Sequence, residues 1–338
     1  MKFNTVVILT LLLSILCSAC RLKEKEIYVL STPAGNTFTQ IDKEGKTVIP
    51  NGRFITPLGK SIQVAPHPYG LTLSRDGNIA ITANSGTQPL SISIIRNLLS
   101  EQPEVQQIPP GPSTDKGVLA SVFMGLAISP DNKLVYVAGG QENKVFLFDL
   151  ATGNKIGFID CNFSSQEIEY LNGYIGDLVL SQDGRSLYAV DQMNFRMIIL
   201  DTEKREIKHN VPVGRYPFGI ALSPDGKKVY VANVGMFTYK KISGIDEHNL
   251  KDTALKFPPF AYLSSEARDG IKIDSLEVSG LGEPNVPAAF SVWTISLENP
   301  ESPAVIAKTK TGHLVGEMIA GIPAVGGSSP NSLVATSN

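Results

Sequence analysis

The sequence has few of the residues on which several protein classes depend. Of its 338 residues, three are cysteine, one is tryptophan and four are histidine. Three cysteines cannot build the disulfide framework of a small secreted scaffold. The 30 lysine and arginine residues balance 32 aspartate and glutamate residues, and no basic run interrupts that balance. The composition therefore argues against a nucleic-acid partner and against a polybasic membrane binder.

What the sequence does have is apolar residues and turn formers. Hydrophobic residues make up 42% of the chain, which excludes global disorder and is enough for a sizeable core. The 30 glycines and 22 prolines require frequent turns. Many short strands joined by tight turns satisfy both features better than long helices, so we predict an all-β protein.

The N-terminus is typical of an export signal. Lys2 precedes an apolar stretch over residues 6–16, and small residues lead up to Cys20. We predict a signal peptide over residues 1–19. The end of this segment resembles the bacterial lipobox, although Cys17 stands where leucine is usual. The resemblance implies that Cys20 carries lipid and anchors the protein to a membrane of the cell envelope, on its periplasmic or surface side. The alternatives are plain secretion and an uncleaved anchor.

Residues 20–26 are predicted to be a charged tether, and residues 27–338 the folded domain. One pattern recurs four times in that domain: an apolar strand, a Ser-x-Asp-Gly turn or close variant, and a second apolar strand. The turn aspartates are Asp76, Asp131, Asp183 and Asp225, and eight residues after each comes Asn84, Gly139, Asp191 or Asn233. Aspartate bonds the backbone ahead of it, and glycine or asparagine accepts the positive φ of the turn. We interpret these aspartates as structural.

The repeat predicts a β-propeller of four-stranded blades. A single small sheet would expose both of its faces, so the copies must stack on one another. A Trp-Asp repeat propeller would carry a tryptophan in nearly every blade, whereas this chain has Trp293 alone. An immunoglobulin-like sandwich has no reason to repeat one internal interval. We expect four to five blades.

Two parts of the chain depart from the repeat. Residues 235–289 interrupt the fourth copy, and we expect them to form a partly ordered cap. Residues 330–336 resemble a first strand, while residues 27–31, 38–41 and 62–64 resemble second, third and fourth strands. The two ends could close a fifth blade, or the chain could be part of a longer propeller.

Some segments resemble a known family. Tyr230-Val-Ala-Asn233 resembles the YVTN propeller repeat, which also occurs in propeller lactonases. Residues 67–74, 215–219, 287–293 and 311–334 resemble the propeller part of bacterial lipoproteins in which a YVTN propeller precedes an alkaline-phosphatase-type phosphoesterase domain. The resemblance implies further blades, up to the seven of a complete family member, and then a metal-dependent hydrolase. The sequence departs from that pattern because it ends at Asn338, and we therefore expect a C-terminally truncated chain rather than a closed ring of five blades.

Loops that enter the first strand of each blade reach the mouth of the central channel, where propellers often bind ligands. Five residues of these loops are our candidate ligand contacts: His67, Arg215, Tyr216, His313 and Glu317. When the loops are aligned by their proline and glycine, His67 and Tyr216 occupy equivalent places. An anionic or sugar-like ligand would suit this set of groups. Both histidines could equally be structural, and a helix that would pair His313 with Glu317 is disfavoured by Gly312 and Gly316.

Patterns that specify chemistry are missing from the sequence. It contains no zinc-protease, nucleophile-elbow, phosphate-loop or EF-hand motif, and Cys17-Ser-Ala-Cys20, which has the Cys-x-x-Cys spacing, belongs to the predicted export signal and the lipidation site. We therefore predict no metal and no cofactor. Cys161 has no neighbouring cation and is expected to be a buried apolar residue. We predict a ligand-binding or protein-interaction module without catalytic activity of its own. The alternatives are a lactonase-like hydrolase of a sugar lactone and the N-terminal module of a phosphoesterase.

Overall fold

The computed structural model describes residues 30–42, 45–85, 89–110, 119–240, 248–249, 264–274 and 276–337. The chain divides into two units, residues 1–62 and residues 63–338. Cys20 lies outside the described residues, as do residues 27–29.

In the first unit, strands β1 (Thr47–Val48) and β2 (Phe54–Ile55) form a short antiparallel hairpin. The expectation of strands at 38–41 and 62–64 was wrong. Residues 38–41 contribute one isolated bridge, from Gln40 to Val48, and residues 62–64 form no strand. An apolar segment becomes a strand only where a neighbouring backbone pairs with it along its length, and within the described residues that pairing is limited to the single Gln40–Val48 bridge.

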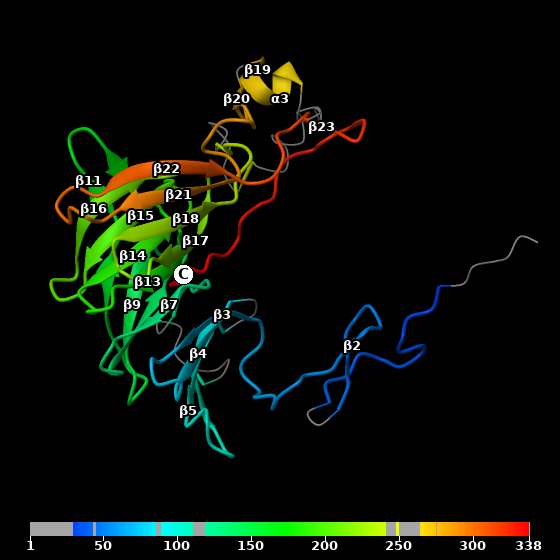
Figure 1. Ribbon diagram of the computed structural model, residues 1–338, viewed down its shortest axis with the longest axis vertical. Helices are drawn as coiled ribbons and strands as arrows, with labels where there is room; N and C mark the ends of the chain where they lie inside the picture. Colours follow the sequence, from blue (N-terminus) through cyan, green and yellow to red (C-terminus); the bar gives the residue numbers. More distant parts are fainter. Residues whose placement is uncertain are drawn as a thin grey trace, which may run out of the picture. The chain divides into compact units, whose positions relative to one another are not determined.

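The second unit contains four antiparallel sheets of four strands each, which we number blades 1 to 4 (Figure 1). Blade 1 consists of β3 (Pro68–Leu73), β4 (Ala80–Asn84), β5 (Ser91–Arg96) and β6 (Glu104–Ile108); blade 2 of β7 (Leu126–Ile128), β8 (Leu134–Ala138), β9 (Lys144–Asp149) and β10 (Lys155–Asp160). Blade 3 consists of β13 (Ile175–Leu180), β14 (Ser186–Asp191), β15 (Arg196–Asp201) and β16 (Glu206–Pro212); blade 4 of β17 (Pro217–Leu222), β18 (Lys228–Asn233), β21 (Ser291–Ser296) and β22 (Ala304–Lys310). Each sheet follows chain order, so the predicted repeat is confirmed.

The first turn of every blade is built by the same hydrogen bonds. A serine hydroxyl donates to the aspartate two residues on and accepts the N–H of the residue five positions on. The donor distances are 2.5 Å for Ser74–Asp76, 2.6 Å for Ser129–Asp131, 2.6 Å for Ser181–Asp183 and 2.5 Å for Ser223–Asp225. The residue after the aspartate has a positive φ in each blade: Gly77, Asn132, Gly184 and Gly226. These contacts explain why the spacing recurs in the sequence.

Apolar side chains hold consecutive blades together in three clusters. The first cluster joins blades 1 and 2 through residues such as Ile92 and Phe148, and the second joins blades 2 and 3 through residues such as Leu147 and Leu187. The third joins blades 3 and 4 and includes Trp293. Each interface is formed by one face of each of two sheets, which is the packing of a β-propeller. The sequence prediction of this fold class is therefore confirmed.

The first strands of neighbouring blades lie very close to each other. A Cβ atom on Gly70 of β3 would lie 1.9 Å from the Met124 carbonyl oxygen, immediately before β7. A Cβ atom on Gly219 of β17 would lie 2.6 Å from the carbonyl oxygen of Asn331. The segment at 330–336 therefore lies beside blade 4 where the first strand of a following blade would lie, but it forms no strand itself.

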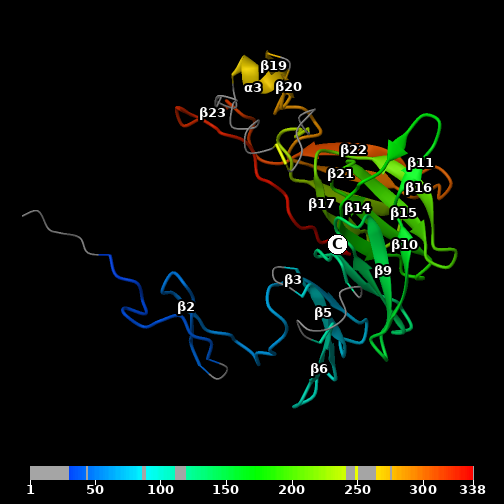
Figure 2. The same cartoon turned by 180° about the vertical axis from the view of Figure 1, so that it is seen from behind.

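The insertion between β18 and β21 contains a short helix, α3 (Ser265–Asp269), and a hairpin of β19 (Gly270–Ile273) and β20 (Leu276–Ser279) (Figures 1 and 2). Residues 241–247, 250–263 and 275 of the expected cap lie outside the described residues. Because the insertion joins the end of a second strand to the start of a third, it emerges at the end of the blade where the first strand begins. It therefore belongs to the same end as the loops that carry the predicted site.

Two further short hairpins lie outside the blades. Hairpin β11 (Phe163–Ser164) and β12 (Glu169–Tyr170) precedes blade 3, and hairpin β23 (Met318–Ile319) and β24 (Ile322–Pro323) follows blade 4. Among the described residues, no helix has both the length and the apolar character needed to span a bilayer.

Candidate functional site

Four aromatic rings, one from each blade, meet at the end where the first strands begin. Phe123 lies at the centre, with ring centroids 5.2 Å from Tyr69, 5.4 Å from Tyr174 and 5.6 Å from Phe218. These separations are typical of favourable aromatic pairs. Tyr69 remains 57% exposed, and the other three rings are partly buried. We call these four residues the aromatic mouth cluster.

The backbone that positions this end is repeated between blades. His67 and Tyr216 have positive φ values of 56° and 49°, and their carbonyl oxygens accept the N–H groups of Ser85 and Val234. In blade 3 the Tyr174 carbonyl accepts the Gln192 N–H in the same way, at 2.9 Å. The predicted equivalence of His67 and Tyr216 thus has a matching backbone, and Tyr174 is the member that the sequence comparison missed.

A register shift at the start of the first strand contributes to this geometry. It falls between Pro68 and Gly70 in β3 and between Pro217 and Gly219 in β17. Such a bulge bends the strand and redirects the residues that precede it. Tyr174 stands three residues before Asp177, as His67 stands three residues before Gly70. Aligning the blades at Gly70 and Asp177, rather than by the proline that follows His67 and Tyr216, would have identified Tyr174 as the equivalent residue of blade 3.

Arg215 and Tyr216 contact the cap. The Arg215 guanidinium donates through Nη1 to the carbonyl oxygens of Met236 at 2.6 Å and Glu283 at 2.8 Å. The Tyr216 hydroxyl accepts the Tyr239 N–H at 2.9 Å. Burial lowers the pKa of Arg215 and raises the pKa of Tyr216, since it disfavours the charged form of each group.

His313 and Glu317 also meet, although no helix brings them together. The distance between His313 Nδ1 and Glu317 Oε2 is 3.3 Å, within a turn. The same carboxylate oxygen accepts the Leu314 N–H at 2.9 Å, and this bond, followed by the one to His313, lowers the pKa of Glu317. The four-residue spacing was therefore informative without the helix that we had taken as its condition.

The structure brings four of the five predicted residues into one connected region. Arg215 and Tyr216 touch the cap, and Asn285 of the cap is tied to Val315 by two hydrogen bonds, of 3.1 and 2.9 Å. Val315 lies in the turn between His313 and Glu317. His67 belongs to blade 1 and makes no contact with these residues in the described part of the structure.

Lys310, at the end of β22, is a cation that the sequence analysis did not select. Its ammonium group donates to three carbonyl oxygens of the cap, those of Pro284 at 3.3 Å, Val286 at 3.3 Å and Ala289 at 2.9 Å. Burial and then the charge of Arg215 lower the pKa of Lys310. Lys310 is the last residue of a polar fourth strand, and nothing in the sequence around it indicates that it contacts the cap.

Gln192 supplies an unpaired polar group beside the aromatic mouth cluster. Its Nε2 atom is buried and has no hydrogen-bond partner among the described residues. A Cβ atom on Gly176 of β13 would lie 2.4 Å from that nitrogen, so the amide lies against the first strand of blade 3. A buried donor without a partner costs about 1–3 kcal/mol.

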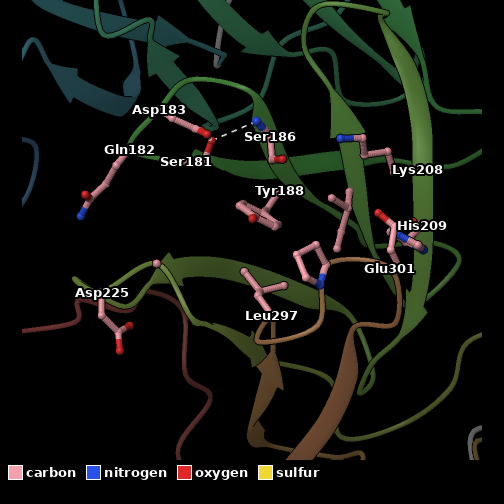
Figure 3. Close-up of a pocket in the computed structure, with 13 residues that line it drawn as sticks. Ser181, Gln182, Asp183, Ser186, Tyr188, Lys208, His209, Asp225, Leu297 and Glu301 are labelled. Carbon is pink, nitrogen blue, oxygen red and sulfur yellow. Dashed lines mark hydrogen bonds between the residues drawn. The ribbon is translucent and has the colours of Figure 1, made fainter.

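A separate pocket of about 440 Å³ lies between blades 3 and 4 (Figure 3). Tyr188 lies between the turn at Ser181 and Leu297, while Asp225 points away from the Tyr188 ring. The volume would suit a small molecule. However, the pocket is lined by turns between first and second strands, at the opposite end from the predicted site. Its carboxylates Asp183 and Asp225 bond the N–H groups of their own turns.

No group of three or more histidine, cysteine, aspartate or glutamate side chains within the described ranges is placed to hold a metal ion. The candidate groups at this end of the blades are the aromatic mouth cluster and, where blade 4 meets the cap, the cations Arg215 and Lys310. An arrangement of this kind can bind a small molecule through an apolar face and through polar or negatively charged groups.

The chain matches no protein-family model and no curated protein. Among solved structures it is similar to a periplasmic gluconolactonase of Pseudomonas aeruginosa, with 20% identity and a TM-score of 0.38, over 56% of this chain and 55% of that one. It is also similar to a Lactobacillus plantarum protein, with 16% identity and a TM-score of 0.40, over 56% and 57% of the two chains. A hydrazine synthase of Kuenenia stuttgartiensis is similar at 15% identity, with a TM-score of 0.37, over 76% and 72%. The match spans about half of the first two proteins, and the fold assignment rests on the blades described above.

Proposed function

We propose that this protein is a ligand-binding propeller module and that the aromatic mouth cluster forms the floor of its binding site. The observation that supports this most is that one ring from each blade is brought to one place while Tyr69 stays 57% exposed. Rings needed only for packing between blades would gain by complete burial, because hydrophobic stabilisation is proportional to the apolar area removed from water.

The ligand that suits the cluster has one apolar face and several polar groups at its edge. A sugar ring has this character, since its C–H bonds lie on a face and its hydroxyls around the rim. The face would pack on the rings. The hydroxyl of Tyr174 would bond the rim, and we keep His67, Arg215, Tyr216, His313 and Glu317 as the polar groups offered to the same ligand.

The repeat type, the signal peptide and the lipid anchor are parts of the proposal that rest on the sequence alone. We propose that the repeat is of the YVTN type, that residues 1–19 are removed as a signal peptide, and that lipid on Cys20 holds the module at a membrane of the cell envelope. The mass of the mature N-terminal peptide tests this. A diacylated or triacylated Cys20 is the expected result, and an unmodified N-terminus or an intact leader would contradict the anchor.

Titration calorimetry on the chain without its leader tests binding. We expect at least one of glucose, galactose and mannose to bind, and we expect Tyr69→Ala to weaken that binding about tenfold, since one exposed ring face contributes roughly 1–2 kcal/mol. Phe158→Ala is the control, because Phe158 is another exposed aromatic residue, on β10 of blade 2, and is 49% exposed.

Two results would overturn the proposal. The first is no heat of binding with any of the three sugars. The second is an equal loss of affinity in Tyr69→Ala and Phe158→Ala. A pH-stat assay of the same preparation measures hydrolysis of gluconolactone. Activity in that assay would favour the lactonase-like hydrolase over the binding module.

A further inference from the structure

Two cations hold the cap on blade 4, and both do so through backbone carbonyl groups. Arg215 bonds the carbonyl oxygens of Met236 and Glu283, and Lys310 bonds those of Pro284, Val286 and Ala289. A carbonyl oxygen accepts a hydrogen bond but carries no net charge. Both positive charges therefore remain uncompensated by these contacts.

Among the described residues, neither Arg215 nor Lys310 forms an ion pair with a carboxylate. The charged group that faces both cations is the Glu283 carboxylate, which influences the pKa of each from beyond ion-pair distance. One oxygen of that carboxylate accepts the Asn285 N–H at 3.1 Å. Two positive charges against one negative charge leave the region positive.

The cations also act on each other. The charge of Arg215 is the second cause, after burial, of the lowered pKa of Lys310. Two like charges held close together in partly buried surroundings repel each other, and a bound anion would relieve that repulsion. The region is therefore more favourable for an anion than for a neutral group.

Arg215 has donors left for such an anion. Both of its hydrogen bonds leave from Nη1, so Nε and Nη2 are unused within the described structure. Gly282 lies next to this edge: a Cβ atom there would be 3.2 Å from Nη2, and glycine supplies none. Guanidinium groups bind carboxylate and phosphate oxygens through two parallel donors.

We propose that the Nε and Nη2 edge of Arg215 binds an oxyanion group of the ligand, a carboxylate or a phosphate ester, and that Lys310 adds to the attraction through its charge. This inference rests on the proposed ligand-binding function and names the class of ligand: a sugar acid or sugar phosphate. Lys310 acts through its charge alone, because its three donors are taken by the cap.

The test compares neutral and acidic sugars on the same protein by calorimetry. The pairs are glucose with glucuronate, galactose with galacturonate, and glucose with glucose 6-phosphate. We expect the acidic member of at least one pair to bind about tenfold more tightly, because the oxyanion adds a charge-assisted hydrogen bond that the neutral sugar cannot make. The carboxylate pairs and the phosphate pair show which oxyanion is preferred.

Substitutions of Arg215 and Lys310 test whether these two residues cause the preference for the acidic sugar. Arg215→Gln and Lys310→Gln should reduce the preference for the acid, because each removes a charge while glutamine can still donate to a carbonyl. Lys308→Gln is the matched control, since Lys308 lies on the same strand and contacts the Trp293 ring. It should leave the preference unchanged.

If a substitution disrupts the folding of the cap, the salt dependence of the affinity of the wild-type protein provides an independent test. Raising NaCl from 50 to 500 mM should weaken binding of the acid more than binding of the neutral sugar. Equal affinity within every pair, or a preference that survives Arg215→Gln in a folded protein, would overturn the inference and leave the proposed function intact. No binding by any sugar of the panel would overturn both.

Discussion

Asp191 and Arg196 face each other as the last residue of β14 and the first of β15, and they form an ion pair of 2.9 Å in which neither side chain is exposed. In blades 1 and 4 the same two positions hold neutral pairs, Asn84 with Ser91 and Asn233 with Ser291. Arg196 also donates to the Cys161 carbonyl and lies 4.4 Å from the centre of the Tyr170 ring. The charged pair thus ties blade 3 to the neighbouring β10 end and the β11–β12 hairpin.

Removing one partner of this pair should be strongly destabilising. Arg196→Met leaves the Asp191 carboxylate buried without its cation, which costs about 3–5 kcal/mol of the free energy of unfolding. The double variant Asp191→Asn with Arg196→Ser, which reproduces the pair of blades 1 and 4, should recover part of that loss. Urea unfolding measures both. Lys204→Met, which removes an exposed ion pair of 3.7 Å, is the control, and a loss no larger than in that control would contradict the prediction.

The close approach of blades at Gly70 gives a second prediction. A Cβ atom there would collide with the Met124 carbonyl, so Gly70→Ala must push β7 away and should lower the free energy of unfolding by about 1–3 kcal/mol. Gly59→Ala is the control, because nothing lies within 4 Å of the added carbon. Thermal unfolding compares the two, and equal melting temperatures would show that the first strands can separate without cost.

Asp177 predicts a pH dependence of stability. Its carboxylate accepts the Ile220 N–H of β17 at 3.2 Å, and burial raises its pKa from 3.8 to about 6. The folded state therefore binds a proton more tightly than the unfolded state. The stabilisation is complete below about pH 4 and is lost as the pH rises through about 6, by an amount on the order of 3 kcal/mol.

The Asp177→Asn variant isolates this contribution from that of other carboxyl groups. Asp76, Asp131, Asp183 and Asp225 have pKa values lowered chiefly by their turn serines, so they act in the opposite direction and lose stability as the pH falls. The difference in melting temperature between wild type and variant should therefore change between pH 4 and pH 7, in favour of the variant at the higher pH. A constant difference would show that Asp177 does not titrate there.

Cys161 should be chemically inert in the folded protein. The thiol is fully buried, and burial raises its pKa, so little thiolate forms and no reagent reaches it. In a chain with Cys17→Ser and Cys20→Ser, a thiol reagent such as Ellman's reagent should react only at the rate of unfolding. Fast reaction in native buffer would contradict the burial of this residue.

The parts of the fold that the sequence predicted are local. The Ser-x-Asp-Gly turn, its two flanking strands and the residue that ends the second strand all lie within about a dozen positions, and their hydrogen bonds are made between near neighbours. The structure confirms those elements in all four blades. The predictions of strands at 38–41 and 62–64 were wrong, because a strand needs a partner backbone along its length and these segments make only the single Gln40–Val48 bridge.

The sequence by itself determined the repeating blade and the turns that close it, since a turn needs particular φ angles and particular side chains at adjacent positions. The tertiary structure decided which groups meet at the mouth. Tyr69 and Phe218 lie on β3 and β17, whereas Phe123 and Tyr174 lie in the segments before β7 and β13, some 40 to 55 residues from one another along the chain. Lys310 reaches Arg215 only through the folded cap. Their convergence depends on how the sheets stack around the axis, and stacking is set by the shape of three apolar interfaces rather than by any short run of residues.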